Sequence, residues 1–387
     1  MVKAIKVMLI PNNVQETKMF EYAGASRFAY NWALAREKEN YEKGGRFISD
    51  SELRKEFTKL RHSDEYAWLL NISNNVTKQA IKDACNAYKN FFKGLKKIPR
   101  FKSRKRSMPK FYQDNVKIQF SNTHVKLEGF SSSRKANKQK LNWVRLAEHG
   151  RISTDAKYMN PRISFDGLNW WISVCVEFPD CKEILNADGV GIDLGIKDLA
   201  VCSDAVKYKN ISKSQKVKKL EKQKRRLQRS ISRSYEKNKK GESYCKTNNV
   251  IKKEKLLLKR NHRLTNIRKN YLNQTISEIV NRKPRFICIE DLNVSGMMKN
   301  RHLSKVVQEQ GFFLFRKQLE YKCSDKGIQL IVADRFYPSS KLCSCCGKIK
   351  EDLKLSDRIY RCECGNMIDR DFQASINLKA YGERFAS

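Results

Sequence analysis

Residues 338–378 read PSSKLCSCCGKIKEDLKLSDRIYRCECGNMIDRDFQASINL, and this stretch decides the fold of the chain's last part. Cys343 and Cys346 form a C-x-x-C pair, and Cys362 and Cys364 follow after fifteen intervening residues as a tighter C-x-C pair. Four thiolates in two pairs at such a gap are the ligand set of a tetrahedral zinc site. Because four thiolates leave no coordination position for water, we predict a zinc ion that folds a small module and does no chemistry.

The choice of zinc ligands leaves one alternative open among the cysteines. Cys345 is a spare thiol inside the cluster and competes with its neighbours as a ligand. The chain has 12 cysteines but is long and shows no secretion signal, so metal binding in a reducing cytosol fits better than disulfides. Five cysteines with apolar neighbours are predicted to be small core residues: Cys85, Cys175, Cys202, Cys288 and Cys323.

Acidic residues at three places in the chain are candidates for one shared site. Asp369-Arg370-Asp371 follows the last thiol and opens a predicted helix, while Asp193 and Glu290 lie far upstream in GVGIDLGIKDLAVC and FICIEDLNV. Both upstream segments are apolar and strand-like, and alternation sends Asp193 to the face opposite its apolar neighbours. An acid inside a buried strand is costly unless it is paired or bound to a metal. We therefore expect these carboxylates to share a site.

Cleavage of a phosphodiester needs an activated water and a stabilised leaving oxygen, which two divalent cations about 4 Å apart can supply. Carboxylate oxygens suit Mg²⁺ or Mn²⁺. We predict that Asp193, Glu290 and one acid of the Asp369-Arg370-Asp371 run are the catalytic metal ligands. Each has a structural alternative: Asp193 as a turn residue, Glu290 as a polar strand exit, and either Asp369 or Asp371 as only the helix N-cap.

Composition narrows the class of partner. The chain has 387 residues, enough for two or three domains, and 80 Lys plus Arg against 41 Asp plus Glu give a formal charge of +39. Such a charge opposes compaction unless a polyanion neutralises it. With no apolar run of about 18 residues and no signal peptide, nucleic acid is a better candidate than a membrane.

Basic residues in two regions are predicted to contact nucleic acid. One region is the linker 98–111, and the other is a basic helix within 213–240, a segment that contains 13 Lys or Arg and only two acids. The candidates in these regions are Arg100, Lys102, Arg104, Lys105, Lys224, Arg225, Arg226 and Arg229, and Arg370, between Asp369 and Asp371, is a further candidate. Aromatic residues near them are candidates for base stacking or for barrel core: Phe101, Phe111, Tyr112, Trp143, Trp170 and Trp171.

Periodicity predicts an order of elements. A strand at 3–10 precedes helices within 12–97, one capped by Ser49 or Asp50 and another by Asn74 or Asn75. Short strands typical of a small barrel then follow, with a hairpin at Asp166-Gly167: 116–120, 124–130, 141–146, 158–165 and 169–178. The second half alternates buried strands with helices: strands near 189–202, 286–290 and 328–334, and helices at 213–240, 251–280, 304–326 and 371–380.

Five stretches together resemble the TnpB family, OrfB-type insertion-sequence proteins similar to compact relatives of type V CRISPR effectors. They are GIDLGIKDLAV, HRLTNIRKNYLNQTISEIV, ICIEDLNVSGM, ADRFYPSSKLCSCCG and YRCECGNMIDRDFQASINL. The resemblance is strong over about 187–387 and weaker in RFAYNWAL and KKIPRFKSRK. The family's three acids fall on Asp193, Glu290 and Asp371, although Gln373 stands where relatives commonly have Asn.

The resemblance implies an α+β multidomain fold. A RuvC-like, ribonuclease-H-like α/β nuclease domain would comprise 187–334 and 367–387, with a basic helical hairpin at 213–280 and a zinc module for target nucleic acid at 335–366. A small wedge β-barrel, 1–11 and 98–186, would carry a helical recognition insert at 12–97.

The implied function is RNA-guided cleavage of DNA, with sequence reading delegated to a guide RNA from the mobile element. The partners would be that RNA and double-stranded target DNA, with no membrane, no small-molecule substrate and no predicted oligomeric state. The location would be the cytoplasm, at the nucleoid. Three alternatives stay open: a transposase that joins DNA strands itself, an RNA-guided repressor without nuclease activity, and a ribosomal or chaperone-like RNA binder.

Overall fold

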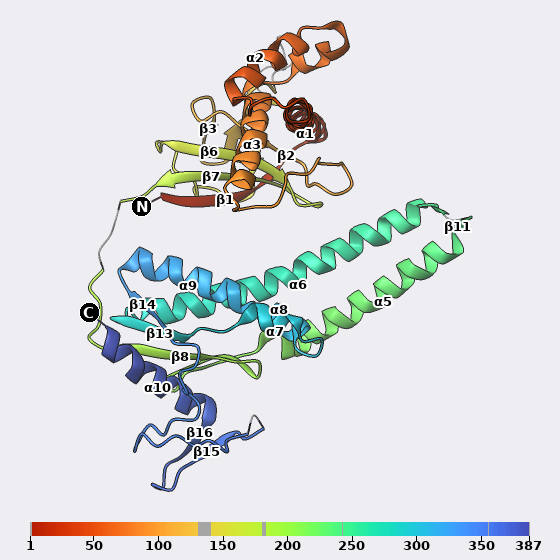
Figure 1. The fold of residues 1–387 in the computed structure, drawn as a ribbon. Coiled ribbons are helices and arrows are strands. Elements are labelled where there is room, and N and C mark those ends of the chain that lie inside the picture. Colours follow the sequence, from red (N-terminus) through yellow and green to blue (C-terminus); the bar gives the residue numbers. More distant parts are fainter. Residues whose placement is uncertain (1, 131–140, 180–182, 242, 355, 387) are drawn as a thin grey trace. The chain divides into compact units, whose positions relative to one another are not determined.

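The computed structural model describes residues 2–130, 141–179, 183–241, 243–354 and 356–386 (Figure 1). The chain forms two compact units, Met1–Pro179 and Asp180–Ser387. Mixed α/β content agrees with the predicted α+β class. The finer predicted domain boundaries stay predictions. Among the described residues, no helix combines the length and apolar character needed to cross a membrane.

The first unit contains an antiparallel seven-stranded sheet of order β2-β6-β7-β1-β5-β4-β3. β1 pairs with β7 along its length, and the Asp166-Gly167 turn joins β6 to β7 as predicted, with Gly167 at φ +94°. The strands are β1 Val2–Ile10, β2 Lys110–Tyr112, β3 Gln119–Phe120, β4 His124–Lys126, β5 Trp143–Leu146, β6 Tyr158–Phe165 and β7 Trp170–Glu177.

Three α-helices, α1 Asn13–Glu42, α2 Asp50–Arg61 and α3 Asn74–Phe92, pack with the sheet of this unit, and a 3-10 helix spans Asp64–Asn71. Capping boxes start α1 and α2, and Ser49 caps α2 as predicted. The cap predicted for α3 is wrong by one residue, because the Ser73 hydroxyl accepts the Asn75 N–H. Cys175, predicted to be core, is half-buried.

The second unit is built on a five-stranded sheet of order β10-β9-β8-β13-β14. β8, β9 and β10 are antiparallel neighbours, whereas β8, β13 and β14 are parallel. The strands are β8 Val190–Leu194, β9 Asp198–Cys202, β10 Lys207–Lys209, β13 Phe286–Glu290 and β14 Gln329–Ala333.

Helices cover both faces of this sheet (Figure 1). Ile287 and Ile289 of β13 pack with α6 and α9, while Phe286 and Cys288 pack with α10, as strand alternation requires. A Cβ on Gly191 of β8 would overlap the Ser375 carbonyl of α10, so glycine permits this close approach. The helices are α6 Asn248–Asn281, α9 Phe312–Lys326 and α10 Arg370–Phe385.

The predicted helix 304–326 is two helices, α8 Ser304–Gln310 and α9. Gly311 between them is left-handed at φ +70°, so the chain turns and buries Phe312 and Phe315 on the sheet. α10 also runs past the predicted end near Ala380, to Phe385. α7, Val294–Lys299, was not predicted.

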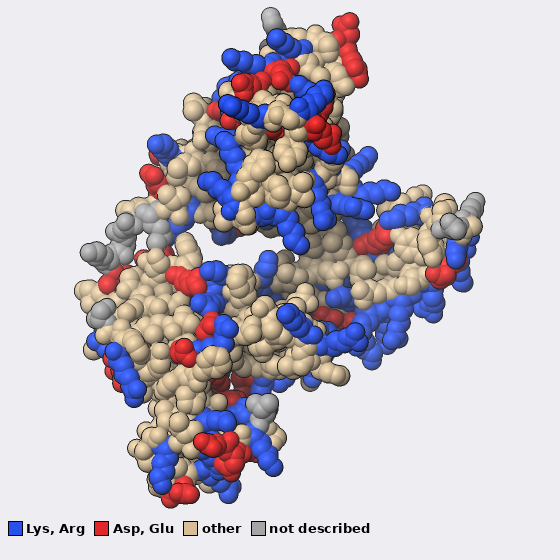
Figure 2. Space-filling model, in the orientation of Figure 1, with Lys and Arg blue, Asp and Glu red and all other residues tan. Residues whose placement is uncertain are grey.

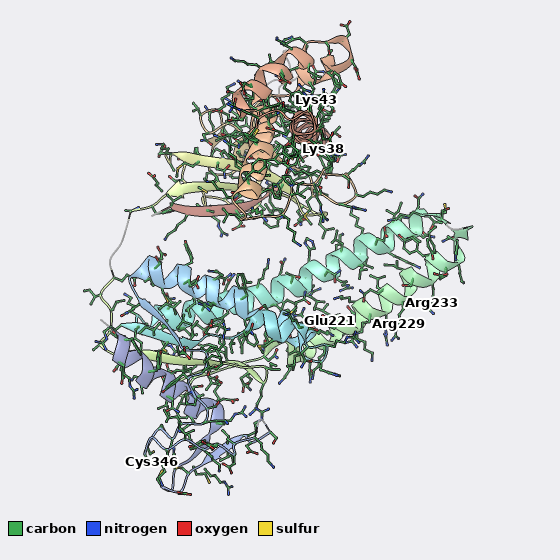
Figure 3. All side chains as sticks on the ribbon, viewed as in Figure 1. Lys38, Lys43, Glu221, Arg229, Arg233 and Cys346 are labelled. Carbon is green, nitrogen blue, oxygen red and sulfur yellow. The ribbon has the colours of Figure 1, made fainter. Side chains whose placement is uncertain are left out.

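The basic hairpin consists of α5, Gln215–Lys237, and α6, joined by the short strands β11 Lys239–Lys240 and β12 Ser243–Tyr244; a 3-10 turn, Ile211–Lys213, precedes α5. Val217, Leu220 and Leu264 form a small core at its base. Lys and Arg gather along it in Figure 2, and Arg229 and Arg233 project from α5 in Figure 3. The short strands β15 Ile359–Arg361 and β16 Met367–Asp369 lie in the cysteine-containing segment before α10.

Candidate active site and zinc module

Two parallel strands bring the first two acids together. β13 pairs with β8 in the register Cys288 to Gly191 and Ile289 to Ile192, so Glu290 follows on beside Asp193. Gly191 faces α10 and Ile192 faces the other side, so Asp193 shares the face of Gly191. Both carboxylates therefore lie on the α10 face, at the carboxyl ends of their strands.

The third acid comes from the first turn of α10. Asp369 is the N-cap, and its carboxylate accepts the N–H groups of Asp371 and Phe372, both at 3.1 Å, and pairs with Lys207 at 3.2 Å. Asp371 is free of that capping role, and Arg370 pairs with it at 3.2 Å. The competition left open by the sequence thus separates into a capping acid, Asp369, and an acid, Asp371, whose charge raises the pKa of both strand carboxylates.

Electrostatics shows that the three carboxylates sense one another. Loss of hydration and the charges of Glu290 and Asp371 raise the pKa of Asp193 well above its usual value, while Arg370 acts in the opposite direction. Loss of hydration also raises the pKa of Glu290, with Asp371 adding to the rise and Ser339 opposing it. Asp369 differs: burial acts to raise its pKa, but the Phe372 N–H and Lys207 hold it below the usual value.

The surroundings of Glu290 orient it. The buried Ser339 hydroxyl donates a hydrogen bond to its carboxylate. The adjacent Asp291 instead pairs with Arg316 at 2.7 Å and Arg335 at 2.5 Å, and these partners lower its pKa. A cavity of about 340 Å³ opens beside Glu290, and Arg316 and Arg335 line it. Glu290 and these two arginines therefore line the same pocket.

The donor set suits hard divalent cations. Like-charged carboxylates with raised pKa values gain when a cation replaces the proton. The oxygens of Asp193, Glu290 and Asp371 are not among the described groups of three or more ligand atoms that all lie within 4.8 Å. Carboxylates spread around two ions about 4 Å apart need not lie so close together.

The four predicted zinc ligands do lie within this distance of one another. The sulfurs of Cys343, Cys346, Cys362 and Cys364 all lie within 4.8 Å of one another, with 3.6 Å from Cys343 to Cys364 and from Cys346 to Cys362. Gly347 and Gly365 follow the two pairs at φ +72° and +87°. Left-handed glycines close both turns and aim the thiols inward. Cys345 is exposed and outside the cluster.

The pKa values of two thiols in the cluster are shifted in opposite directions. Burial acts to raise the pKa of Cys343, but the N–H groups of Cys346 and Cys345 and the Asn366 amide lower it to about 6. The Asn366 N–H acts to lower the pKa of Cys364, yet the Cys346 thiol and burial raise it to about 12. Cys343 therefore ionises more readily than Cys364. A four-cysteine cluster of this geometry fits zinc, which holds all four as thiolates.

A buried amide network ties this module to α10. Gln373, fully buried, donates to the Leu342 carbonyl at 2.6 Å and accepts hydrogen bonds from Ser344 at 2.9 Å and Asn366 at 3.3 Å. Asn377, one turn later, donates at 2.7 Å to the carbonyls of Ser339 and Leu342. Gln373, which stands where relatives commonly have Asn, therefore links the module to the helix that carries Asp371.

Most of the predicted nucleic-acid contacts are exposed. Arg225, Arg226 and Arg229 line a shallow cavity of about 650 Å³ on α5. Lys102 differs, because its ammonium lies 3.0 Å from the Tyr30 ring centre and its backbone is held by Asn31. Burial and the charge of Lys110 lower the pKa of Lys102 to about 8. The remaining predicted positions are Arg100, Arg104 and Lys105, all exposed, Lys224, 3.9 Å from Glu221, and Arg370.

Sequence reasoning missed Ser339, Asn366 and Asn377. Each is a polar residue whose partner lies far along the chain: Ser339 and Glu290 are 49 residues apart. A weak signal existed, since Ser339 and Asn377 lie in the stretch that carries the family resemblance. Of the aromatic candidates, Phe111 and Trp170 are core, whereas Phe101 is 58% exposed.

Three family models match parts of the chain. "Helix-turn-helix domain" covers residues 1–46, "Probable transposase" covers 173–301, and "Cas12f1-like, TNB domain" covers 312–378. The first matches a region where the structure has one strand followed by one long helix. The third contains the four cysteines and Asp371.

Whole-length relatives are also found. "Putative RNA-guided DNA endonuclease InsQ" of Escherichia coli (strain K12) is 30% identical over 398 residues, which is 98% of this chain and 92% of that protein. "Putative RNA-guided DNA endonuclease" of Streptomyces pristinaespiralis is 28% identical over 98% of this chain and 89% of that protein. The chain in "Cryo-EM structure of the Cas12f1-sgRNA-target DNA complex" has a TM-score of 0.61 at 12% identity, with 98% of each chain covered, which shows a shared fold.

Proposed function

The chain belongs to the TnpB family, and on this premise we propose that it is an RNA-guided DNA endonuclease of a mobile genetic element. Its guide would be an RNA from the element, and its substrate double-stranded DNA that pairs with the guide. We place its action in the cytoplasm, at the nucleoid.

One observation carries the proposal: Asp193, Glu290 and Asp371 converge from two parallel strands and a helix on one face of a sheet. The sheet's order, with three antiparallel strands followed by two parallel ones, supports a RuvC-like, ribonuclease-H-like domain over 187–334 and 367–387. An RNA binder that does no chemistry would not need three mutually repelling carboxylates in a half-buried pocket.

These three residues would hold Mg²⁺ or Mn²⁺, which when bound activates water and stabilises the leaving oxygen. Ser339 keeps the Glu290 carboxylate oriented, and Asp369 fixes the start of the helix that carries Asp371. Arg370 offsets part of the negative charge of the pocket and would contact the scissile phosphate.

The rest of the chain would hold nucleic acid. The seven-stranded sheet of the first unit would be the wedge barrel, 1–11 and 98–186, with the recognition insert at 12–97. Zinc would hold the module 335–366 in shape against target DNA, and the basic hairpin 213–280 would neutralise phosphates. Because the Lys102 ammonium is packed on Tyr30, we assign it to structure and leave phosphate binding to its exposed neighbours.

The test is cleavage of a target plasmid by protein purified with its RNA. Asp193→Asn, Glu290→Gln and Asp371→Asn should each abolish Mg²⁺-dependent cutting and leave RNA binding intact. Asp188→Asn is the matched control, because Asp188 is an exposed acid two residues before β8. Cutting by any of the three variants at the wild-type rate would remove that acid from the site.

A transposase that joins DNA strands itself is the second candidate, favoured by the family description "Probable transposase" over 173–301. Three metal-binding acids serve either reaction, so the guide decides. Removal of the co-purified RNA should stop cleavage of the matched plasmid and should yield no joined product. Cutting or strand joining that persists without RNA would establish the second candidate.

A further inference from the structure

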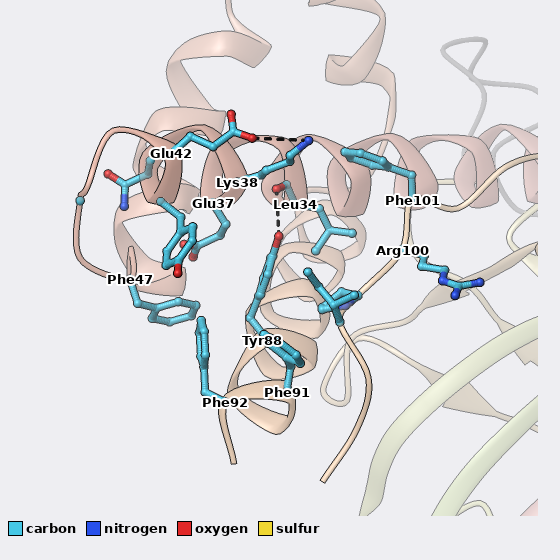
Figure 4. A pocket seen from close by; sticks show the side chains of 15 residues that line it. Leu34, Glu37, Lys38, Glu42, Phe47, Tyr88, Phe91, Phe92, Arg100 and Phe101 are labelled. Carbon is cyan, nitrogen blue, oxygen red and sulfur yellow. Dashed lines mark hydrogen bonds and ion pairs between the residues drawn. The ribbon is translucent and has the colours of Figure 1, made fainter. Parts of the chain in front are cut away.

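Two cavities of similar size lie along α1 in the first unit, and their charges differ. The first, of about 680 Å³, opens between the ends of α1 and α3, and six aromatic rings line it (Figure 4). Its charged lining consists of two acids and two cations, and Lys38 pairs with Glu42 at 3.5 Å. Because the charges of this aromatic cavity balance, it offers little attraction to a polyanion.

The second cavity, of about 730 Å³, lies beside residues 20–27 of α1, with the turn 104–106 and the end of β6 as its other walls. Its charged lining consists of four cations and one acid: Arg27, Arg104, Lys105, Arg106 and Glu21. Glu21 pairs with Lys18 at 3.4 Å, whereas no ion pair or hydrogen bond among the described residues uses any of the four cationic side chains. This cavity therefore has an uncompensated positive charge.

The turn that carries three of these cations is held at both ends. Asn31 of α1 holds the backbone of Lys102 by two hydrogen bonds of 2.8 Å, and the Phe165 N–H donates to the Pro109 carbonyl at 2.9 Å. Within the turn, the Ser103 carbonyl accepts two further N–H groups at 3.2 and 2.9 Å. Because the backbone is already fixed, a ligand that binds here does not have to order it.

Gly24 lies in the lining of this cavity, in the interior of α1. Glycine is a poor helix former, because its backbone loses more freedom on folding than that of any other residue. A Cβ at Gly24 would meet no atom within 4 Å, so packing does not exclude a side chain at this position. A ligand that approaches the helix closely at this point accounts for the glycine.

The lining also selects the kind of ligand. Four cations exceed the charge of one phosphate group, which carries about two negative charges at most. Phe20 and Met108 line the same cavity and are 41% and 68% exposed. A sugar–phosphate chain combines repeated negative charge with the apolar faces of its sugars, so it complements both parts of the lining.

We propose that this cavity binds the sugar–phosphate backbone of a nucleic-acid strand. The strand lies over Gly24, and Arg27 and the turn 104–106 contact its phosphates. The inference rests on the proposed function and deepens it, since it names a site where the first unit holds nucleic acid. It does not involve the three acids, so binding here is measured without cleavage. RNA and DNA share this backbone, and two probes separate them.

Fluorescence anisotropy with a labelled uridine dodecamer and a labelled thymidine dodecamer tests the proposal on the full-length chain freed of RNA. Arg27→Gln should lower the affinity about tenfold and reduce the slope of log affinity against log salt by about 0.7, as loss of one phosphate contact does. Arg46→Gln removes the same charge from an exposed position of this unit outside the cavity and should change neither. A loss with both probes assigns the site to the shared backbone, and a loss with one identifies the strand as RNA or DNA.

Gly24→Ala separates binding from folding. Alanine is the better helix former, so the melting temperature should rise by about 2 °C. The affinity should fall at the same time, because the added methyl group occupies the place where the strand approaches α1. Ser26→Ala, on the same helix but outside the cavity lining, should keep the wild-type affinity. In the wild type, a bound probe should also slow the acetylation of Lys105, followed by mass spectrometry.

Three results would each overturn the proposal: Arg27→Gln with the wild-type affinity and salt slope, Gly24→Ala that binds as tightly as the wild type, or no protection of Lys105 by either probe. Guided plasmid cleavage by the wild type reports separately on the proposed function. A chain that binds the probes through this cavity but does not cut would keep this site and lose that function.

Discussion

Replacement of Gln373 by alanine tests the link between the zinc module and α10. The side chain is fully buried and takes part in three hydrogen bonds, to Leu342, Ser344 and Asn366. Leu342 keeps a second bond to Asn377 at 2.7 Å, and Asn366 keeps a contact with the Cys343 sulfur at 3.4 Å. Those partners stay partly satisfied, so the net loss is about 1 kcal/mol for each bond, or about 3 kcal/mol in all.

The assay is urea unfolding of the zinc-loaded protein, with zinc release followed by a chromogenic chelator. Gln373→Ala should lower the free energy of unfolding by about 3 kcal/mol and speed zinc release, because the module loses its anchor. Gln373→Asn keeps the amide and should lose less. Glu383→Ala, on an exposed position of the same helix, should stay within about 0.5 kcal/mol of wild type.

A further readout separates anchoring from general stability. At a temperature where all variants are folded, Gln373→Ala should cut target DNA more slowly than Glu383→Ala, since Asp371 lies two residues away on the same turn. The reasoning fails if Gln373→Ala unfolds within about 0.5 kcal/mol of wild type and releases zinc at the wild-type rate.

Four other changes have defined outcomes. Asp193→Asn should raise the melting temperature in magnesium-free buffer, because burial and like charge raise the pKa of Asp193 and make its ionised form costly; a lower melting temperature would contradict this. The folded state binds protons at Asp193 and Glu290 more tightly than the unfolded state, so the free energy of unfolding without magnesium should rise as pH falls towards the ordinary carboxyl range. Over the same pH range the cleavage rate at fixed Mg²⁺ should fall, and added Mg²⁺ should restore it. A pH profile of cleavage that does not depend on the Mg²⁺ concentration would disprove this prediction. Cys343→Ser should lower bound zinc from about one ion per chain, whereas Cys345→Ser should leave it unchanged, as measured by metal analysis. Gly191→Val should lower the free energy of unfolding by about 1–3 kcal/mol, because its side chain would press on the Ser375 carbonyl; an unchanged urea midpoint would show that α10 can shift freely.

Local patterns in the sequence predicted much of the second unit. Alternation alone placed Asp193 opposite Ile192 and Leu194, and the structure agrees. The spacing of the thiols predicted the four-cysteine cluster, including the tighter second pair. Such patterns work because the period of a strand and the reach of a metal site are set by neighbouring residues.

Contacts between distant segments could not be predicted in the same way. The choice between Asp369 and Asp371 depends on which carboxylate caps the helix, and both stand at its start. Gly311 interrupts an apolar pattern that continues on both sides, and only packing on the sheet decides that the chain turns there. Gln373 meets Leu342 across 31 residues, a separation that carries no periodic signal.

The helix that delivers Asp371 also seals one side of the sheet, with Leu378 fully buried against Phe286. A molecule in which α10 no longer packs on the sheet has lost part of its core and the Asp371 carboxylate at the same time. Damage to the core should therefore produce fewer competent molecules, each turning over at the normal rate. Titration of active molecules per milligram would then serve as a measure of how much of a preparation is properly formed.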